Sequence, residues 1–471
     1  MTRPWRTFLM ISIGVFASLL DLFIVSVAIP DLRRDFAGSG LAELSWALNG
    51  YAIVFAALLV PAGRIADLYG RRRAFIAGMS LFVLASAACA AAPSAAFLIA
   101  ARVLQGAGAA ILTPSSLGVV LPAFAPPRRP AVIAAWSAVG AFGAAAGPAL
   151  GGLLIQASWR WIFLINLPLG LASIWYAARR LDESRDPRAH GLPDITGTLA
   201  LMLGIGALTL ALVQGREWGW DSPATLAAFA VAAGTTAGAV ARSVRHPVPV
   251  LELPLLRVPS FALAVAATFA FFVAFGALLL AAVLFLTQVW GHSILRAGLE
   301  LAVGPLAALA FAAVASRVGP RLGMATIGAI GGVLVATGLA YNAARLGLAP
   351  NYAGAFLPGQ LVTGAGVGLS IPAFTAVAVS AAGPARIATA VGISAMSRQV
   401  GVALGVAGFV AIVGTPTRYQ AIDSYRHGWI FMAAAATVGA LLMLATRLTA
   451  PRAPAPGAPA PADRHELRPV R

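Results

Sequence analysis

The stretch Gly63–Phe75, GRIADLYGRRRAF, places five charged residues between two strongly apolar runs. The runs cover residues 44–62 and 74–92. A helix needs about 20 mainly apolar residues to cross the hydrocarbon core of a bilayer, and both runs are close to this length. The stretch is therefore predicted to be a short loop between two membrane-spanning helices.

The composition extends this prediction to the whole chain of 471 residues. Hydrophobic residues make up 60% and charged residues 10%, whereas about a quarter of the residues in soluble globular domains are charged. The mean hydropathy is +0.86. We expect an all-α integral membrane protein, in which the net charge of +17 reflects membrane topology and no nucleic acid is bound.

Apolar segments of spanning length recur along the chain, and we count fourteen. They cover residues 9–30, 44–62, 74–92, 95–118, 130–156, 161–178, 194–214, 223–242, 260–288, 298–316, 323–343, 353–378, 387–413 and 428–447. With the N-terminus inside, 23 of the 33 basic residues fall in cytoplasmic segments and eight in outer loops. This positive-inside bias predicts fourteen spans in the inner (plasma) membrane with both termini cytoplasmic.

Two longer polar stretches, at residues 179–194 and 242–260, divide the predicted spans into groups of six, two and six. The resulting divisions are a first six-helix bundle (1–180), a linker with two additional spans (181–258), a second six-helix bundle (259–450) and a tail (451–471). The tail is rich in Ala and Pro and is predicted to be a disordered cytoplasmic segment. Two six-helix halves are typical of transporters that rock about a central site.

Two polar positions inside predicted spans are candidate functional residues. Asp21 lies near the middle of the first span, where a carboxylate has to be protonated, paired or exposed to a water-filled cavity. It is a candidate proton carrier, or alternatively a group that hydrogen-bonds a neighbouring helix. Arg102 and Gln105 share one face of the fourth span. Arg102 either needs a buried partner or extends to the nearby membrane surface.

Glycines form a stripe in the fifth span, where GAFGAAAGPALGG covers residues 140–152. Gly140, Gly143, Gly147 and Gly151 permit close helix contact, and Pro148 removes a backbone hydrogen bond. Gly401 and Gly405 in the thirteenth span, beside Arg398 and Gln399, have a similar pattern. Ordinary helix packing also explains both stripes.

Other candidate chemistry is sparse. The five histidines lie in predicted loops or the tail without metal-ligand spacing, so we expect no metal site. There is no lysine and hence no phosphate-binding GxxxxGK[ST] motif, and no nucleophile, base and orienting group occur together. We therefore expect neither an enzyme nor a cofactor. Possible residues of an apolar substrate cavity are Gln105, Trp136, Phe272, Phe275 and Arg398.

Several motifs together resemble the major facilitator superfamily, and specifically its fourteen-helix drug/proton antiporter family. GRIADLYGRRR matches the loop signature between the second and third helices. The remaining likeness is carried by LLDLFIVSVAIP (19–30), ARVLQGAGAAILTP (101–114), GAAAGPALGG (143–152), WRWIFLINLPLG (159–170), LVQGREWGWDSP (212–223) and SRQVGVALGVA (397–407). In the second half, ASRVGPRLG (315–323) is a degenerate counterpart of the loop that lacks the Asp.

The resemblance implies a major facilitator fold and roles for three groups of residues. Asp21 would be the proton-linked acid, assisted by Arg102. Gly143, Gly147, Pro148, Gly151 and Gly152 would form the hinge of an antiporter. Gly63, Asp67, Gly70, Arg71 and Arg72 would form a cytoplasmic latch that holds the two halves together in the outward-open state. A loop that only sets topology would need Arg71–Arg73 but no acid.

The resemblance also implies a function: proton-coupled export of lipophilic small molecules or antibiotics by alternating access. Relatives that expel dications carry a second acid deep in the tenth span, whereas Glu300 lies at its outer end. We therefore expect a neutral, weakly basic or monocationic lipophilic substrate, membrane lipids as the other partner, and a monomer. The alternatives are a dedicated exporter of an endogenous metabolite or lipid and a non-transporting membrane sensor or scaffold.

Overall fold

The computed structural model describes residues 3–125, 128–185, 191–382, 386–417 and 419–449. These residues form helices and connecting segments without a β-strand in the described ranges. The helices are α1 (Arg3–Asp35), α2 (Leu41–Tyr69), α3 (Arg71–Ala90), α4 (Ala95–Val120), η1 (Leu121–Ala123), α5 (Arg129–Leu154), α6 (Trp161–Leu164), α7 (Asn166–Arg180), α8 (Ile195–Trp218), α9 (Pro223–Arg245), α10 (Leu253–Leu256), α11 (Pro259–Leu284), η3 (Phe285–Val289), α12 (Ile294–Leu322), α13 (Met324–Arg345), η4 (Tyr352–Phe356), α14 (Leu357–Ala382), α15 (Ile387–Val413) and α16 (Ala421–Thr449).

The helix lengths confirm an all-α membrane protein. Among the described residues, thirteen helices are long and apolar enough to cross a membrane. In addition, α5 occupies the position of the predicted fifth span with 26 residues. The total of fourteen spans and their grouping as six, two and six stay predictions, and the predicted disordered tail lies outside the described residues.

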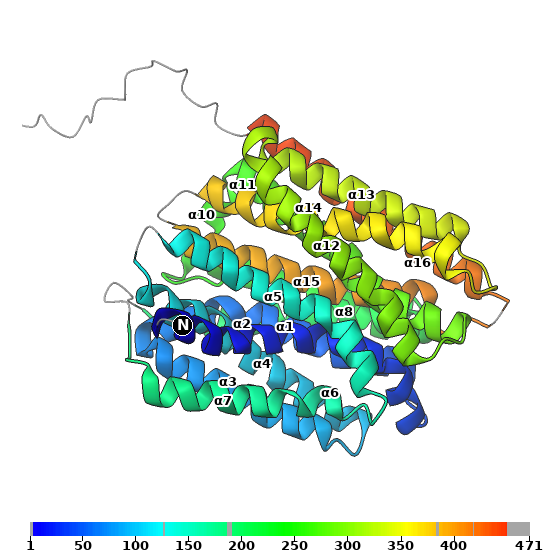
Figure 1. The fold of residues 1–471 in the computed structure, drawn as a ribbon, viewed down its shortest axis with the longest axis horizontal. Helices are drawn as coiled ribbons and strands as arrows, with labels where there is room; N and C mark the ends of the chain where they lie inside the picture. Colours follow the sequence, from blue (N-terminus) through cyan, green and yellow to red (C-terminus); the bar gives the residue numbers. More distant parts are fainter. Residues whose placement is uncertain (1–2, 126–127, 186–190, 383–385, 418, 450–471) are drawn as a thin grey trace, which may run out of the picture.

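The helices form two bundles that lie side by side (Figure 1). In the first bundle, α1 packs on α5, and α4 packs on α2 and α3. In the second, α11 packs on α15 and α16, and α14 packs on α12 and α13. Between the bundles, α2 contacts α15 and α5 contacts α12. These cross-contacts place α2, α5, α12 and α15 at the junction of the two halves.

The additional helices α8 and α9 pack on each other, and α8 also contacts α2 of the first half and α15 of the second. Asp194 caps α8 by accepting a hydrogen bond from the Gly197 N–H and forms a 2.6 Å ion pair with Arg242 of α9. Burial alone would raise the pKa of Asp194, but the bonds from Arg242 and Gly197 outweigh it and lower the pKa. The helix α8 thus contacts both bundles, and the Asp194–Arg242 ion pair joins α8 to α9 at one end.

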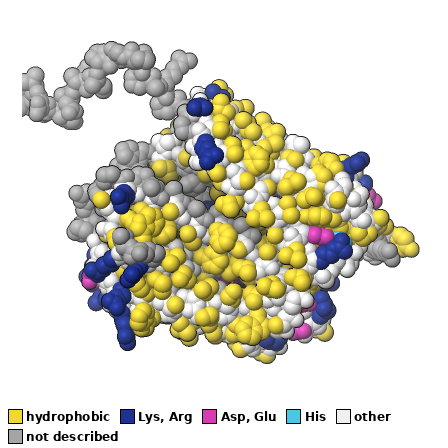
Figure 2. Space-filling view, in the orientation of Figure 1, with side chains coloured by type: hydrophobic (Ala, Val, Ile, Leu, Met, Phe, Trp, Pro, Cys, Tyr) yellow, Lys and Arg dark blue, Asp and Glu magenta, His cyan; other side chains and the backbone are white. Residues whose placement is uncertain are grey.

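Apolar side chains cover the middle of the surface, whereas arginines gather toward the ends of the bundle (Figure 2). One end carries the turn between α2 and α3 and the segment after α7, with Arg71–Arg73, Arg179 and Arg180. We call this the basic end, and the other the opposite end. An apolar belt between two charged ends is the surface expected of a protein surrounded by lipid.

Candidate functional site

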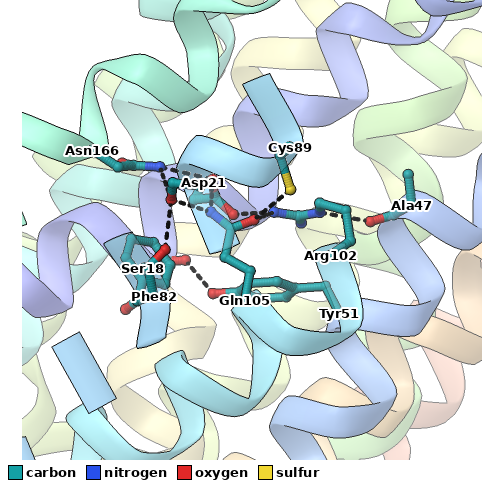
Figure 3. A network of polar contacts seen from close by, with 10 residues as sticks. Ser18, Asp21, Ala47, Tyr51, Phe82, Cys89, Arg102, Gln105 and Asn166 are labelled. Carbon is teal, nitrogen blue, oxygen red and sulfur yellow. Dashed lines mark hydrogen bonds and ion pairs between the residues drawn. The ribbon is translucent and has the colours of Figure 1, made fainter. Parts of the chain in front are cut away.

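Asp21 and Arg102 meet in the interior of the first bundle (Figure 3). Asp21 of α1 and Arg102 of α4 form an ion pair, and both side chains have an exposed fraction of 0%. Charges buried this completely are tolerated only when they are paired and hydrogen-bonded. The alternative in which Arg102 extends to the membrane surface is therefore wrong, because its guanidinium points into the bundle.

Three neutral side chains complete the network around Asp21. Gln105 donates to the second carboxylate oxygen of Asp21 at 2.8 Å and accepts from Arg102 at 2.6 Å. Asn166 of α7 donates to the same Asp21 oxygen at 3.0 Å, and both amides also donate to the Ser86 hydroxyl of α3. The carboxylate therefore receives hydrogen bonds from α4 and α7 in addition to its ion pair.

Arg102 has further partners that do not involve Asp21. Its Nε donates to the Ala47 carbonyl of α2 at 2.8 Å, and its Cζ lies 4.2 Å from the centre of the Tyr51 ring. The Tyr51 hydroxyl donates to the Ser18 carbonyl at 3.0 Å, which ties α2 to α1 beside the ion pair. One guanidinium nitrogen, NH2, is buried without a hydrogen-bond partner. The guanidinium therefore has contacts with α2 in addition to its ion pair with Asp21.

Local sequence features bring these groups together. A Cβ at Gly106 would lie 2.6 Å from the Tyr51 carbonyl, and one at Gly108 would lie 2.6 Å from the Phe82 nitrogen. The two glycines thus let α4 approach α2 and α3 closely enough for Arg102 and Gln105 to reach their partners. The break between α6 and α7 falls just before Asn166 because Pro168 cannot accommodate the Leu164 carbonyl in a continuous helix.

The predicted glycine hinge forms the contact of α5 with α1. A Cβ at Gly143 would lie 2.6 Å from the Phe16 carbonyl, and one at Gly147 would lie 3.2 Å from the Ile24 nitrogen. Gly140 and Gly151 face the same helix, whereas Gly152 faces α12, where its Cβ would lie 3.1 Å from the Ile294 carbonyl. Across that contact, a Cβ at Gly298 would lie 2.7 Å from the Pro148 carbonyl. The stripe therefore serves both packing within the first half and contact between the halves.

The predicted latch residues lie at the basic end. Asp67 near the end of α2 and Arg71 at the start of α3 form a 2.8 Å ion pair across the turn, and Arg72 donates to the Ala177 carbonyl of α7. Gly70 adopts a φ of +123°, and a Cβ at this position would lie 2.5 Å from the carboxyl carbon of Glu183. Gly63 lies against Pro114 of α4. The hydrogen bonds and ion pairs described for Asp67, Arg71 and Arg72 join residues 67–184 only. In this conformation, none of these described bonds reaches the second half.

Glu183 is a partner of this loop that the sequence did not single out. Its carboxylate accepts hydrogen bonds from the backbone N–H groups of Arg72 and Arg73, at 3.0 and 3.2 Å. The N-terminus of a helix favours such an anion because its first N–H groups have no partner within the helix. Glu183 therefore anchors the segment after α7 to the start of α3. The acidic residues of LDESRD (181–186) were the available signal.

The residues predicted to line a substrate cavity divide into two groups. Gln105 is fully buried in the Asp21 network, and its assignment to a substrate cavity stays a prediction. Trp136 of α5 donates to the Ser116 hydroxyl of α4 at 3.1 Å. Phe275 contacts Phe23 of α1 across the halves, with ring centres 5.6 Å apart.

Phe272 and Arg398 lie together in the second half. Phe272 is buried and packs edge-to-face on Phe275, with ring centres 5.6 Å apart. The guanidinium of Arg398 lies over the Phe272 ring at 5.7 Å from its centre. A chain of contacts therefore runs from Phe23 of α1 through Phe275 and Phe272 of α11 to Arg398 of α15.

Glu300 and His292 lie at the opposite end. Glu300 binds His292 Nδ1 at 2.8 Å and Arg296 Nε at 2.9 Å. The Glu300 carboxylate is therefore paired near the start of α12, at the opposite end of the bundle. Among the residues that the structure describes, no group of three or more His, Cys, Asp or Glu side chains could hold a metal ion.

Other residues of the Asp21 network were missed by sequence reasoning. Asn166 and Ser86 are isolated polar residues within apolar segments, which is the one sequence signal they offer. Such residues are common in membrane helices as ordinary hydrogen-bonding groups. Only the three-dimensional contact shows that both face Asp21.

A model of the Major Facilitator Superfamily matches residues 11–406. The chain belongs to this superfamily. This superfamily member is 36% identical to the Multidrug resistance protein Stp of Mycobacterium tuberculosis over 85% of its own length and 74% of the relative. It is 32% identical to the Methylenomycin A resistance protein of Bacillus subtilis over 92% of both chains. It is therefore a transporter of the major facilitator type, homologous to drug and antibiotic resistance proteins.

Solved structures support the fold of this major facilitator protein. A proton-dependent oligopeptide transporter structure aligns with a TM-score of 0.66 and 16% identity, and covers 94% of this chain and 99% of the other. The xylose transporter XylE from E. coli aligns with a TM-score of 0.64 and 13% identity over 94% and 99% of the two chains. At these identities the likeness concerns the fold alone. The expected major facilitator fold is confirmed.

Proposed function

We propose that this transporter is a proton-coupled antiporter that exports lipophilic small molecules from the cell. It would lie in the inner (plasma) membrane with both termini in the cytoplasm, so that the basic end faces inward as the positive-inside rule requires. The observation that carries the proposal is the fully buried Asp21–Arg102 pair. An ionisable pair inside a membrane bundle marks a proton or ion pathway more often than it serves stability, because burial of the charges is costly.

Protonation of Asp21 is the coupling step. A proton on the carboxylate removes the negative charge that faces Arg102, while Gln105, the Ala47 carbonyl and the Tyr51 ring continue to hold the guanidinium. Asp21 links α1 to α4 and α7, so a change in its bonds alters the packing of three helices at once. One charge moved through 100 mV contributes about 2.3 kcal/mol, which is enough to drive accumulation of a neutral compound on the other side.

Rocking of the two halves would expose the substrate to alternate sides. The contact of α5 with α12 at Gly152 and Gly298 closes the opposite end between the halves. At the basic end, Asp67, Arg71 and Arg72 bind only within residues 67–184 in the contacts described. This arrangement is consistent with a conformation open toward the cytoplasm, in which a latch between the halves would be released.

Everted membrane vesicles test the coupling. Uptake of a compound to which overexpression confers resistance is measured with a proton gradient imposed, for the parent chain and for Asp21→Asn. We expect the substitution to abolish gradient-driven uptake but to leave gradient-independent exchange of labelled for unlabelled compound, since the amide keeps the shape of the site. Asp31→Asn, which removes a surface pair with Arg34, is the control and should transport normally. Gradient-driven uptake by Asp21→Asn would exclude Asp21 as the coupling residue.

A dedicated exporter of a metabolite made by the same cell is the second candidate. It is favoured by a 33% identical relative named Probable actinorhodin transporter, of Streptomyces coelicolor, matched over 88% of this chain and 72% of that protein. A resistance panel separates the two. Resistance to several unrelated compounds, lost with an uncoupler, supports broad export, whereas resistance to one compound supports the dedicated exporter. A sensor or scaffold would give no resistance to any compound.

A further inference from the structure

The second half contains an arginine whose charge is not compensated. Arg398 of α15 has no carboxylate within ion-pair distance and no hydrogen bond in the part of the chain that the structure describes, and its one recorded interaction is with the Phe272 ring at 5.7 Å. Arginine keeps its charge under all physiological conditions. A guanidinium inside a membrane bundle is stable only with a counter-charge, carbonyl groups or water. Arg398 is half-buried, so its guanidinium borders space that water or a bound group can occupy.

Neighbouring polar groups on the same helix also have unused hydrogen-bonding capacity. Gln399 is 1% exposed, and neither its Nε2 nor its Oε1 has a partner. Ser394 is buried, and its hydroxyl is equally unpartnered. Ser394 lies one helical turn before Arg398, so the two share a face of α15. Since buried polar groups are normally hydrogen-bonded, three donor-bearing side chains without partners in one stretch indicate a site for a bound group.

The position of this cluster is suited to a substrate. α15 packs on α11 of its own half and on α2 of the other half. Phe272 under Arg398 contacts Phe275, which contacts Phe23 of α1, so an aromatic path leads from the guanidinium to the first half. In transporters built from two halves, the substrate site lies at the interface between the halves, and the halves move relative to each other around it. The cluster thus combines a cation and amide donors with an aromatic wall.

We propose that Ser394, Arg398 and Gln399 bind the acidic group of an amphipathic substrate, a carboxylate or phenolate attached to an aromatic body. A carboxylate can accept two parallel hydrogen bonds from one guanidinium, and the Ser394 hydroxyl and Gln399 amide supply further donors. The aromatic body would lie against Phe272 and Phe275. This proposal rests on the proposed export function and replaces the expectation of a neutral or cationic substrate.

The charge of the substrate changes the energetics of exchange. In one-for-one antiport, inward movement of a proton and outward movement of an anion transfer two charges in the same electrical direction. A neutral substrate transfers one charge and a monocation none. Export of an anion is therefore the mode that gains most from the membrane potential.

Binding to the purified full-length protein tests the site independently of proton coupling. The probes are pairs of fluorescent aromatic compounds that differ only in the polar group, such as pyrenebutyrate and pyrenebutanol, together with naphthoate and naphthalenemethanol. We expect the acid of a pair to bind about tenfold more tightly than the alcohol, which is the effect of one charged hydrogen-bonded contact. Arg398→Gln should remove this difference by weakening the acid alone, and Arg398→Lys should restore part of it.

Arg345→Gln is the matched control, because Arg345 is exposed at the end of α13, and it should bind both probes like the parent chain. Equal affinity for acid and alcohol in every pair would overturn the proposal, as would an acid preference that survives in Arg398→Gln. Either result would leave proton-driven transport of other compounds intact. Conversely, an acid preference that depends on Arg398 in a protein without proton-driven uptake would support this site and reject the antiport mechanism.

Discussion

The two halves of the molecule each place an arginine inside a helix bundle but surround it differently: Arg102 is fully buried, whereas Arg398 is half-buried. Arg102 in the first half has a carboxylate, an amide oxygen, a carbonyl and an aromatic ring around it. Arg398 in the second half has an aromatic ring and no described counter-charge. The two proposals together assign a division of labour, in which the first half would hold a charge pair that a proton can switch and the second half would offer a charge to a ligand.

The largest expected effect is on the stability of the first half. Arg102→Leu would leave the Asp21 carboxylate buried without its counter-ion, which costs about 3–5 kcal/mol. The double variant Asp21→Asn/Arg102→Leu should recover most of this loss because no buried charge is then left unpaired. Thermal unfolding of the purified protein in detergent measures both variants.

The same change in the second half should have the opposite result. Arg398→Leu removes an uncompensated charge and is expected to leave the unfolding midpoint unchanged or to raise it. A loss as large as that of Arg102→Leu would mean that Arg398 is also held by a charged partner, and the contrast between the halves would then be wrong.

A smaller effect is expected at the close helix contacts, where the two halves are alike. A Cβ at Gly143 would lie 2.6 Å from the Phe16 carbonyl, and one at Gly401 would lie 2.7 Å from the Phe269 carbonyl. Gly143→Ala and Gly401→Ala should each lower the free energy of unfolding by about 1–3 kcal/mol, because backbone has to move. Gly206→Ala in α8, with nothing within 4 Å, is the control and should be stabilising. Stable Ala variants at 143 and 401 would show that the contacts are looser than described.

The smallest expected effect concerns the corresponding turns of the two halves. Gly70 and Gly323 both adopt positive φ, at +123° and +82°, but Glu183 binds only the first turn. Glu183→Gln should cost about 1 kcal/mol, since the carboxylate is partly exposed and its charge interactions are screened. Arg321→Gln in the second turn should change the free energy of unfolding by less than about 0.5 kcal/mol. Hydrogen exchange at the start of α3 would locate the effect, and unchanged protection there in Glu183→Gln would contradict the role of Glu183.

Much of the candidate site was visible in the sequence because charges inside apolar spans are rare. Asp21, Arg102 and Arg398 could be selected on that ground alone. The sequence did not pair Asp21 with Arg102 or reveal that Asn166 and Gln105 both donate to the same carboxylate. These partners are 81, 84 and 145 residues from Asp21 along the chain, and no periodicity within one helix carries information over such separations.

The sequence by itself determined the all-α membrane architecture and the approximate helices, because each helix that crosses lipid needs an apolar run of spanning length. Its motifs also indicated the superfamily. Local rules also explain single positions such as Gly70, whose positive φ suits glycine. Only the tertiary structure decided that Arg102 is paired with a carboxylate and that Arg398 has no described counter-charge. The reason is physical: compensation of a charge depends on atoms a few ångströms away in space, and helices from distant parts of the chain supply those atoms.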